Sequence, residues 1–334
     1  MIRVWFNHWF STAYNIINLL KEDETEIIVI GSNQRKHSVI QNACDEWYEE
    51  PALDGEEYIH FCLQFCQEHQ IDVFIPRRKL VDISKHIEQF KKIGVKVMVD
   101  PYERIQSLNN KELAYQLFQG HPRIKVPEHI IVRSVEEFQK AYDILSKQYE
   151  KVCFKLVQDE GGMSFRVIDN SVDIANALNV YPSTKISLKV ALQALKERKE
   201  FKEIMMMPYL PGYEISVDCL KTVDGIIAVP RKKGPSRDES IEFDEDILQM
   251  CYDILEVVPL EYPCNIQFKY LDQIPYFLEV NTRMSGGIQM GCLAAGVNIP
   301  NIALNKLLGI QKSWQIDRST KRVSYIEIPQ IVSE

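Results

Sequence analysis

The sequence predicts an α/β fold, with a parallel sheet in the first hundred residues and an α+β organisation in the rest of the chain. Over residues 1–100, short β-branched runs alternate with helical patterns, which is typical of parallel strands joined by right-handed crossovers. From Arg123 the pattern becomes strand, helix and strand, and later strands are separated by glycine and proline turns. The 334 residues are enough for two or three domains with a sizeable core.

The predicted elements of the first hundred residues follow one another closely. In chain order they are a strand at IRVWF, a helix through NIINLL, a strand at TEIIVIGS, a helix through EEYIHFCLQFCQEH, a strand at IDVFIP, a helix to Lys92 and a strand at VKVMVD. No G-x-G-x-x-G follows the first strand, so a dinucleotide-binding fingerprint is absent. Arg77 and Arg78 follow IDVFIP and could meet a substrate carboxylate, because ligands bind at the carboxyl ends of parallel strands.

The composition argues against nucleic acid and membranes as partners. The net charge is −8 and the pI is about 5.5, whereas nucleic-acid-binding surfaces are usually basic. No apolar run approaches the roughly 18 residues of a membrane span, and MIRVWFNHWFSTAYN lacks a signal-peptide pattern. The eight cysteines include no C-x-x-C pair and are expected to be reduced, buried thiols of a cytoplasmic protein.

The histidines indicate which chemistry the second half can support. All seven lie at or before His129, which argues against a histidine-dependent catalytic triad or a zinc centre beyond that point. The groups that remain are Lys, Arg, Glu, Asp, Asn and Gln together with glycine backbone. This inventory suits the binding of phosphate.

A helix is predicted to begin at Asn109, as its N-cap, with Glu112 three residues later. Lys111 then lies in the first turn, where its charge opposes the helix dipole. It is either a solvated surface lysine or a residue kept for a ligand.

Lys155 is predicted to project from the polar side of a strand. In KVCFKLV, Val152, Phe154 and Leu156 alternate to one face, so Lys155 points to the other. The turn D-E-G-G-M-S follows, and the backbone N–H groups of Gly161 and Gly162 could cradle a phosphate that Lys155 neutralises. The alternative is a plain hairpin turn with a solvated lysine.

Two further segments precede the last hairpin. In IMMMPYLPGYEISVDCL an apolar strand is broken by Pro208, Pro211 and Gly212, which predicts a hinge followed by a second strand. The turn-rich segment PRKKGPSRDES carries four basic residues. It is either a solvated loop or a source of phosphate and substrate contacts, with Arg231 as the inward-pointing member.

The stretch FLEVNTRMSGG is the most informative of the chain. Glu279 and Asn281 share one face of a strand while Leu278 and Val280 face the core. Pairing with the preceding CNIQFKYLDQIPY would put Gln267 opposite Glu279, with Cβ atoms about 5 Å apart. Three hard oxygen ligands of this kind suit Mg²⁺, and Arg283 adds a positive fork. The alternative is a solvated polar hairpin.

These residues resemble a known family. FLEVNTRMSGG is similar to the E-x-N-P-R-x-S-G segment of the ATP-grasp superfamily, CNIQF to the N-V-Q-F strand before it, and AAGVNIPNIALNKLLG to the helix after it. The resemblance covers nearly the whole chain and is close to members like the large chain of carbamoyl phosphate synthetase. The chain departs from the pattern at Thr282 and Leu156, where the family has Pro, and at Pro208, where it often has an acidic residue.

The resemblance implies a domain plan and a set of site residues. It implies a preATP-grasp domain (1–105), a small ATP-grasp subdomain with a glycine-rich lid (106–204) and a C-terminal subdomain with the Mg²⁺ site (205–334), the last two clamping ATP. By resemblance, the metal ligands for Mg²⁺, or Mn²⁺ in its place, are Gln267, Glu279 and Asn281. The catalytic residues are Arg283, Lys155 and Arg231. The nucleotide-binding residues are Lys111, Lys155, Gly161, Gly162, Met207, Tyr209, Leu210 and Glu214.

The function implied by the resemblance is that of an ATP-dependent carboxylate–amine ligase. ATP would be held between the segment of Lys155 and the hairpin of Glu279, and the partners would be a small carboxylate and an amine acceptor. A substrate carboxylate would attack the γ-phosphate in line, giving an acyl phosphate that an amine displaces. The alternatives are a carbamoyl-phosphate-type subunit acting on bicarbonate and a non-catalytic ATP-binding sensor. A homo-oligomer is also left open.

Overall fold

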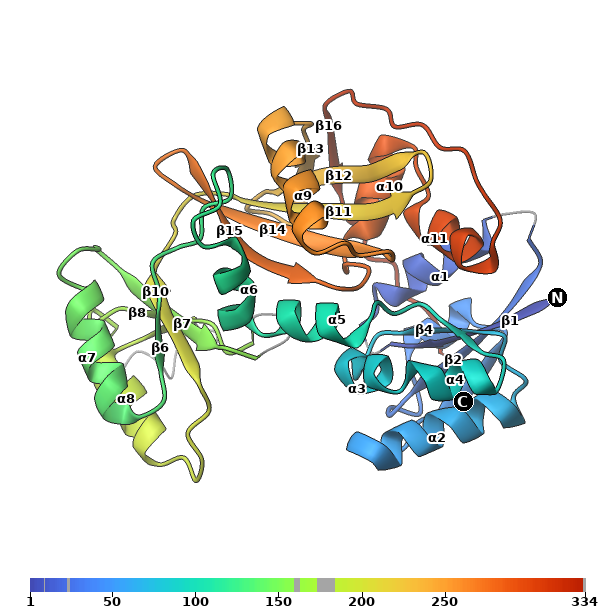
Figure 1. The fold of residues 1–334 in the computed structure, drawn as a ribbon, viewed down its shortest axis with the longest axis horizontal. Coiled ribbons are helices and arrows are strands. Elements are labelled where there is room, and N and C mark those ends of the chain that lie inside the picture. Colours follow the sequence, from blue (N-terminus) through green and yellow to red (C-terminus); the bar gives the residue numbers. More distant parts are fainter. Residues whose placement is uncertain (9, 23–24, 159–162, 173–183, 333–334) are drawn as a thin grey trace. The chain divides into compact units, whose positions relative to one another are not determined.

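The computed structural model describes residues 1–8, 10–22, 25–158, 163–172 and 184–332 (Figure 1). The chain forms two compact units. The first contains Met1–Gln106, Tyr213–Gln267 and Val280–Glu334, and the second contains Ser107–Gly212 and Phe268–Glu279. The three-domain plan expected from the resemblance stays a prediction.

The first unit contains the predicted parallel sheet, in the strand order β3-β2-β1-β4-β5. All four pairings between neighbouring strands are parallel, and Trp5 lies between Ile30 and Phe74. The strands are β1 (Ile2–Asn7), β2 (Ile27–Asn33), β3 (Glu46–Glu49), β4 (Val73–Pro76) and β5 (Lys96–Val97). The sequence pattern did not mark β3, because its four residues EWYE carry a charge at each end.

Helices cover the parallel sheet on both faces (Figure 1). They are α1 (Ala13–Lys21), the 3-10 helix η1 (Val39–Ala43), α2 (Gly55–Glu68), α3 (Leu80–Lys85), α4 (Ile87–Lys92) and α5 (Tyr102–Asn109). On the face of α2, the Trp5 ring stacks on Phe74 with centroids 3.9 Å apart. On the other face, α1 packs into a core that continues into the C-terminal part of the same unit.

The second sheet has six strands in the order β15-β14-β11-β12-β13-β16. They are β11 (Glu214–Thr222), β12 (Gly225–Lys233), β13 (Asp238–Ile241), β14 (Cys264–Leu271), β15 (Ile274–Asn281) and β16 (Lys321–Ser324), accompanied by α9 (Glu245–Val257), α10 (Ile288–Ala295) and α11 (Ile299–Leu308). The outer part of the β14–β15 hairpin, residues 268–279, belongs to the second unit.

The basic segment 230–240 is a hairpin and not the turn-rich loop that its composition suggested. Its first residues complete β12, so that Arg231 pairs with Ser216 of β11. The chain then reverses after Gly234, whose backbone N–H donates to the carbonyl of Asp238. Strand pairing on both sides of β12 outweighs the local preference of Gly, Pro and Ser for a loop.

The second unit is built on a sheet in the order β6-β10-β7-β8-β9. Its strands are β6 (Ile130–Val132), β7 (Val152–Leu156), β8 (Arg166–Ile168), β9 (Lys185–Ile186) and β10 (Ile204–Pro208), with helices α6 (Lys111–Phe118), α7 (Val135–Leu145) and α8 (Leu188–Lys196). Val152, Phe154 and Leu156 join the core under α7 and α8, which confirms the predicted alternation of β7. The fold class predicted from the sequence is confirmed by the parallel sheet and the two α+β sheets.

Two details of the second unit bear on the sequence predictions. The N-cap of α6 is Asn110 and not Asn109, because Asn109 still closes α5, while the Asn110 side chain accepts hydrogen bonds from the backbone of Glu112 and Leu113. The predicted break after β10 is present, and the N–H of Gly212 donates to the carbonyl oxygen of Tyr270 at 3.0 Å. A Cβ at Gly212 would lie 2.5 Å from that oxygen, so glycine is required there.

Candidate functional site

Two buried lysines lie close together in the second unit. Lys111 begins α6, and its backbone N–H donates to the carbonyl of Val157 just after β7, so the helix start is fixed beside the strand of Lys155. Both lysines are buried, Lys111 with 5% of its surface exposed. The Lys111 ammonium lies 3.7 Å from the carboxylate of Glu279. Buried charges of this kind need a charged partner or a ligand.

Tyr115 lies one helical turn after Lys111, on the same face of α6. The Lys155 ammonium is 5.9 Å from the centre of its ring. Burial, and then the nearby Glu279, raise the pKa of the Tyr115 phenol far above its usual value, so the ring stays neutral. Its hydroxyl has no hydrogen-bond partner in the described part of the chain. Lys111, Lys155, Tyr115 and Glu279 therefore form one polar group within the apolar second unit.

In the first unit, Gln267 ends a chain of buried hydrogen bonds. Its amide Nε2 donates to Oδ1 of Asn265 at 3.1 Å, and Nδ2 of Asn265 donates to Oδ1 of Asp218 at 2.8 Å. The Ser216 hydroxyl also donates to Asn265, at 3.0 Å. Because the Gln267 amide nitrogen is used in this way, its carbonyl oxygen remains as an acceptor.

Arg231 continues the same network. Its guanidinium donates to Asp218 at 2.7 Å, to Glu239 at 2.6 Å and to the Ser285 hydroxyl at 2.8 Å. Burial by itself would lower the pKa of Arg231, but Asp218 and Glu239 outweigh it and raise the pKa. The side chain also presses on Gly287, where an added Cβ would lie 2.9 Å from Arg231 Cζ. Arg231 thus ties the sheet to the glycine turn after β15.

The predicted metal ligands supply hard oxygen atoms. Gln267 and Asn281 offer amide oxygens, and Glu279 offers a carboxylate, from the neighbouring strands β14 and β15. This donor set fits Mg²⁺, which prefers oxygen ligands and few protein groups. Across the described residues, no group of three or more His, Cys, Asp or Glu could hold a metal ion, so a zinc-type cluster is not formed there.

A second polar group lies at the carboxyl ends of β1 and β4, in the first unit. The Asn7 side chain accepts a hydrogen bond from the backbone of Arg77 at 2.8 Å and donates to the Tyr58 hydroxyl at 2.7 Å. The Arg77 guanidinium donates to the carbonyl of Met284. This contact joins the edge of the parallel sheet to the segment that carries Arg283.

His8 lies in this polar group and is almost fully buried, with 1% of its surface exposed. Its Nδ1 accepts a hydrogen bond from the backbone N–H of Phe10 at 2.8 Å. Burial, and then the charges of Arg77 and Arg283, hold the pKa of His8 far below its usual value. The imidazole is therefore neutral.

Comparison with known proteins agrees with this architecture. The sequence is 21% identical over 330 residues to the carbamoyl phosphate synthase large chain of Pseudothermotoga lettingae, covering 91% of this chain and 28% of that protein. The chain spans about 28% of the length of the curated relatives it matches. Residues 200–329 match the family model described as ATP-grasp in the biosynthetic pathway with Ter operon.

The chain belongs to the ATP-grasp superfamily. Solved structures share its fold. N5-carboxyaminoimidazole synthetase of Staphylococcus aureus, complexed with ADP, aligns with a TM-score of 0.72 at 12% identity over 96% of this chain and 81% of that one. Biotin carboxylase of Campylobacter jejuni, in a complex with ATP, aligns with a TM-score of 0.69 at 17% identity over 94% of this chain and 73% of that one.

The remaining predicted residues of this ATP-grasp chain lie in different surroundings. Glu214 begins β11 and forms an ion pair with Lys233. In the segment after β10, Met207 and Leu210 are buried and Tyr209 is half-buried. The predicted lid residues Gly161 and Gly162 lie outside the described residues.

Several polar residues of the ATP-grasp chain were not foreseen. Asp218 and Asn265 are buried next to predicted residues, and alternation could have found them, since they lie two positions from Ser216 and Gln267. Glu239 and His8 carry no such signal, because their importance depends on contacts with residues far away in the sequence.

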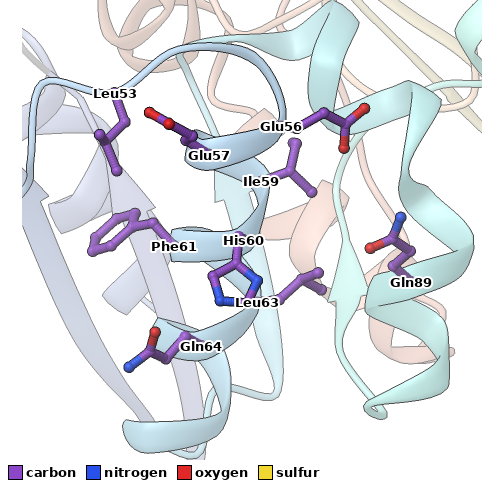
Figure 2. A pocket seen from close by; sticks show the side chains of 9 residues that line it. All are labelled: Leu53, Glu56, Glu57, Ile59, His60, Phe61, Leu63, Gln64 and Gln89. Atoms are coloured by element: carbon purple, nitrogen blue, oxygen red, sulfur yellow. The ribbon is translucent and has the colours of Figure 1, made fainter.

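One cavity of about 630 Å³ lies apart from these groups, on the outer side of the parallel-sheet domain (Figure 2). None of its lining residues belongs to the predicted set. They are Leu53, Glu56, Glu57, Ile59, His60, Phe61, Leu63, Gln64 and Gln89. No helix among the described residues of the ATP-grasp chain is long and apolar enough to cross a membrane.

Proposed function

We propose that this chain is an ATP-dependent ligase that activates a carboxylate as an acyl phosphate and joins it to an amine. A carboxylate oxygen attacks the γ-phosphorus, the bond to the β–γ bridging oxygen breaks, and ADP leaves. The amine then attacks the acyl carbon, and inorganic phosphate leaves with loss of a proton from nitrogen. The observation that carries the proposal is buried Lys111, 3.7 Å from Glu279, a carboxylate of the predicted metal set.

Lys111 and Lys155 would bind the phosphates of ATP. Both ammonium groups are buried, where a charge interaction is stronger than in water, and each is held on a defined element. Lys111 is fixed by its bond to Val157 and Lys155 by the pairing of β7 with β10. Neutralisation of the triphosphate would make γ-phosphoryl transfer to an anionic carboxylate feasible.

Gln267, Glu279 and Asn281 would hold Mg²⁺, or Mn²⁺ in its place. When bound, the ion supplies charge neutralisation of the triphosphate and orients the γ-phosphoryl group. Asn265 holds the Gln267 amide so that its oxygen is the free end. Such supporting hydrogen bonds commonly change metal affinity by about 10–100-fold.

Arg283 would stabilise the negative charge that develops on the transferring phosphoryl group. It follows β15 by two residues, is half-buried, and makes no hydrogen bond or ion pair with another described residue. A planar guanidinium can contact two phosphoryl oxygens at once. Arg231, by contrast, already donates to two carboxylates and to Ser285. We assign it a positioning role on the glycine turn rather than direct contact with substrate.

The nucleoside would be recognised by the segment around β10 and β11. Glu214 would accept hydrogen bonds from the ribose hydroxyls, and the backbone of Met207, Tyr209 and Leu210 would read adenine. Gly161 and Gly162 would cover the phosphates, which excludes water from the acyl phosphate.

A second candidate is a carbamoyl-phosphate-type reaction on bicarbonate. It is favoured by the curated relatives, which are carbamoyl phosphate synthase large chains. Because this chain spans about 28% of those proteins, a partner chain would be needed for a complete synthesis. Release of ADP that depends on bicarbonate but on no organic acid would favour this candidate.

The test is ADP release, measured by a coupled assay against panels of amino acids, other small carboxylates and bicarbonate, with and without amine acceptors. The proposal expects ADP release that requires both a carboxylate and Mg²⁺, and hydroxylamine should trap the acyl phosphate as a hydroxamate. A protein that binds ATP but releases no ADP with any pair would support the non-catalytic sensor instead.

A further inference from the structure

His8 holds a buried hydrogen-bond donor that the proposed ATP reaction does not use. Because Nδ1 accepts from the Phe10 N–H and the ring is neutral, the proton lies on Nε2. Nε2 is buried and has no hydrogen-bond partner in the described part of the chain. Leaving such a donor unpaired costs about 1–3 kcal/mol, so a group at this position is expected to have a ligand.

The charges around His8 indicate the sign of that ligand. Arg77 and Arg283 are the two charged residues whose fields act on the imidazole, and both are positive. Arg77 is buried and held in place by Asn7 and Met284. A neutral N–H donor between guanidinium groups suits an anion, since a cation would be repelled by both.

The nearest acidic residue at this sheet edge is already shared among several partners. Glu50, after β3, accepts hydrogen bonds from Tyr58 at 2.5 Å and Ser32 at 3.2 Å, and Arg78 lies 3.5 Å from it. Its charge is therefore matched by Arg78 and two hydroxyl groups. The position of the site also fits a ligand, because the carboxyl ends of parallel strands are where α/β sheets bind small molecules.

We propose that His8 Nε2–H, together with Arg77 and Arg283, binds the carboxylate group of the substrate that is to be phosphorylated. This inference rests on the proposed function, in which Arg283 meets the transferring phosphoryl group. A carboxylate held by His8 and Arg77 beside Arg283 has its second oxygen directed to the γ-phosphorus. His8 contributes a donor without adding charge, which orients the carboxylate while its nucleophilic oxygen keeps its electron density.

Two substitutions separate this role of His8 from its role in the fold. In His8→Asn the side-chain oxygen replaces Nδ1 and can still accept from the Phe10 N–H, but nothing replaces Nε2–H. In His8→Gln the amide nitrogen reaches the Nε2 position, while the acceptor for Phe10 is lost. His37→Asn, at an exposed histidine, is the matched control.

The experiment uses the full chain with ¹⁵N-labelled histidine and follows the ring nitrogens by NMR while propionate is added. His8 signals are assigned by their loss in His8→Asn. We expect the Nε2–H signal to shift and saturate with propionate, and to stay in place with propionamide, its neutral analogue. Bicarbonate and inorganic phosphate are tested in separate titrations. A response to bicarbonate identifies it as one source of the carboxylate, whereas a response to phosphate alone overturns the proposal.

The affinity for propionate, measured from the ligand signals, gives the second readout. A hydrogen bond to a charged group contributes about 1.5–3 kcal/mol, so His8→Asn should weaken binding by about tenfold or more. His8→Gln should recover part of the loss, and His37→Asn should bind like the wild type. Equal affinity in His8→Asn and wild type, or an unmoved His8 signal at saturation, would contradict the proposal.

These results are independent of turnover. If propionate binds through His8 but no carboxylate supports ADP release, the proposed ligase function fails and the anion site stands. If ADP release requires a carboxylate and His8→Asn leaves the KM for that carboxylate unchanged, the ligase stands and this inference fails.

Discussion

Single residues in the glycine turn after β15 are held by close packing rather than by unusual backbone geometry. Gly287 lies against the Arg231 guanidinium, which cannot move aside because Asp218, Glu239 and Ser285 accept its hydrogen bonds. Replacement of either partner should therefore be felt across the network.

Gly287→Ala should lower the free energy of unfolding by about 1–3 kcal/mol, the usual cost of overpacking. Its Cβ would lie 2.9 Å from Arg231 Cζ, whereas a Cβ at Gly286 would meet only the Thr12 hydroxyl, at 3.3 Å. Gly286→Ala is therefore the matched control and should cost less. Urea unfolding measures both, and equal midpoints for the two variants would show that Arg231 does not restrict Gly287.

Asp100 gives the clearest dependence of stability on pH. Burial raises the pKa of this carboxyl from 3.8 to about 6, although it accepts backbone hydrogen bonds from Glu261 and Tyr262. The folded state then binds the proton more tightly than the unfolded state. The stability that Asp100 contributes is complete below about pH 4 and is lost as the pH rises through 6, by about 3 kcal/mol.

Asp100→Asn removes this titration. The difference in unfolding free energy, variant minus wild type, should rise between pH 4 and pH 7 by about 3 kcal/mol. Exposed Asp224→Asn is the control and should show a flat difference. A flat difference for Asp100→Asn as well would mean that its carboxyl titrates alike in both states.

At the scale of elements, β14 connects the predicted metal ligand to the interior. Gln267 is oriented by Asn265, which is in turn held by Asp218 of β11. The strand thus transmits the position of a buried network to one ligand, and the sheet register decides where the ligand oxygen points.

Asn265→Ala should raise the Mg²⁺ concentration needed for half-maximal activity by about 10–100-fold, because Gln267 loses its orienting partner. Lys269→Ala on the same strand serves as the control and should leave this concentration unchanged. If activity in Asn265→Ala saturates at the wild-type Mg²⁺ concentration, Gln267 is not held by this network or does not bind the metal.

Elements were predicted well where one repeating pattern decides the structure. The parallel strands, the alternation of β7 and the break after β10 follow from β-branched runs, period two and proline. Predictions failed where a neighbour decides. Asn110 caps α6 because α5 runs on through Asn109, and Arg231 lies in a strand because β11 pairs with it.

The candidate site divides in the same way. Its charged residues could be named from motifs, because their spacing along the chain resembles that of ATP-grasp proteins. The network behind them could not, since Asp218, Glu239 and Ser285 meet Arg231 only through folding. His8 escaped prediction for the same reason, because its neighbours Arg77 and Arg283 are distant in sequence.

For the whole molecule, nucleotide binding should appear as a gain in stability. ATP with Mg²⁺ binds only the native state and should raise the melting temperature, by mass action. Glu214→Ala should reduce that shift, because the proposed ribose contact is lost, while Asp224→Ala should not. A shift that Glu214→Ala leaves unchanged would remove Glu214 from the nucleotide site.

The central claim is that this chain transfers a phosphoryl group with the help of Arg283. The most direct measurement compares wild type with Arg283→Ala in two assays, ATP affinity and carboxylate-dependent ADP release. The account predicts nearly equal ATP affinity and turnover lower by a factor on the order of 10² or more, with little recovery in Arg283→Lys because an ammonium lacks the planar two-pronged contact. Equal turnover in Arg283→Ala and wild type, or no ADP release by the wild type with any carboxylate, would contradict it.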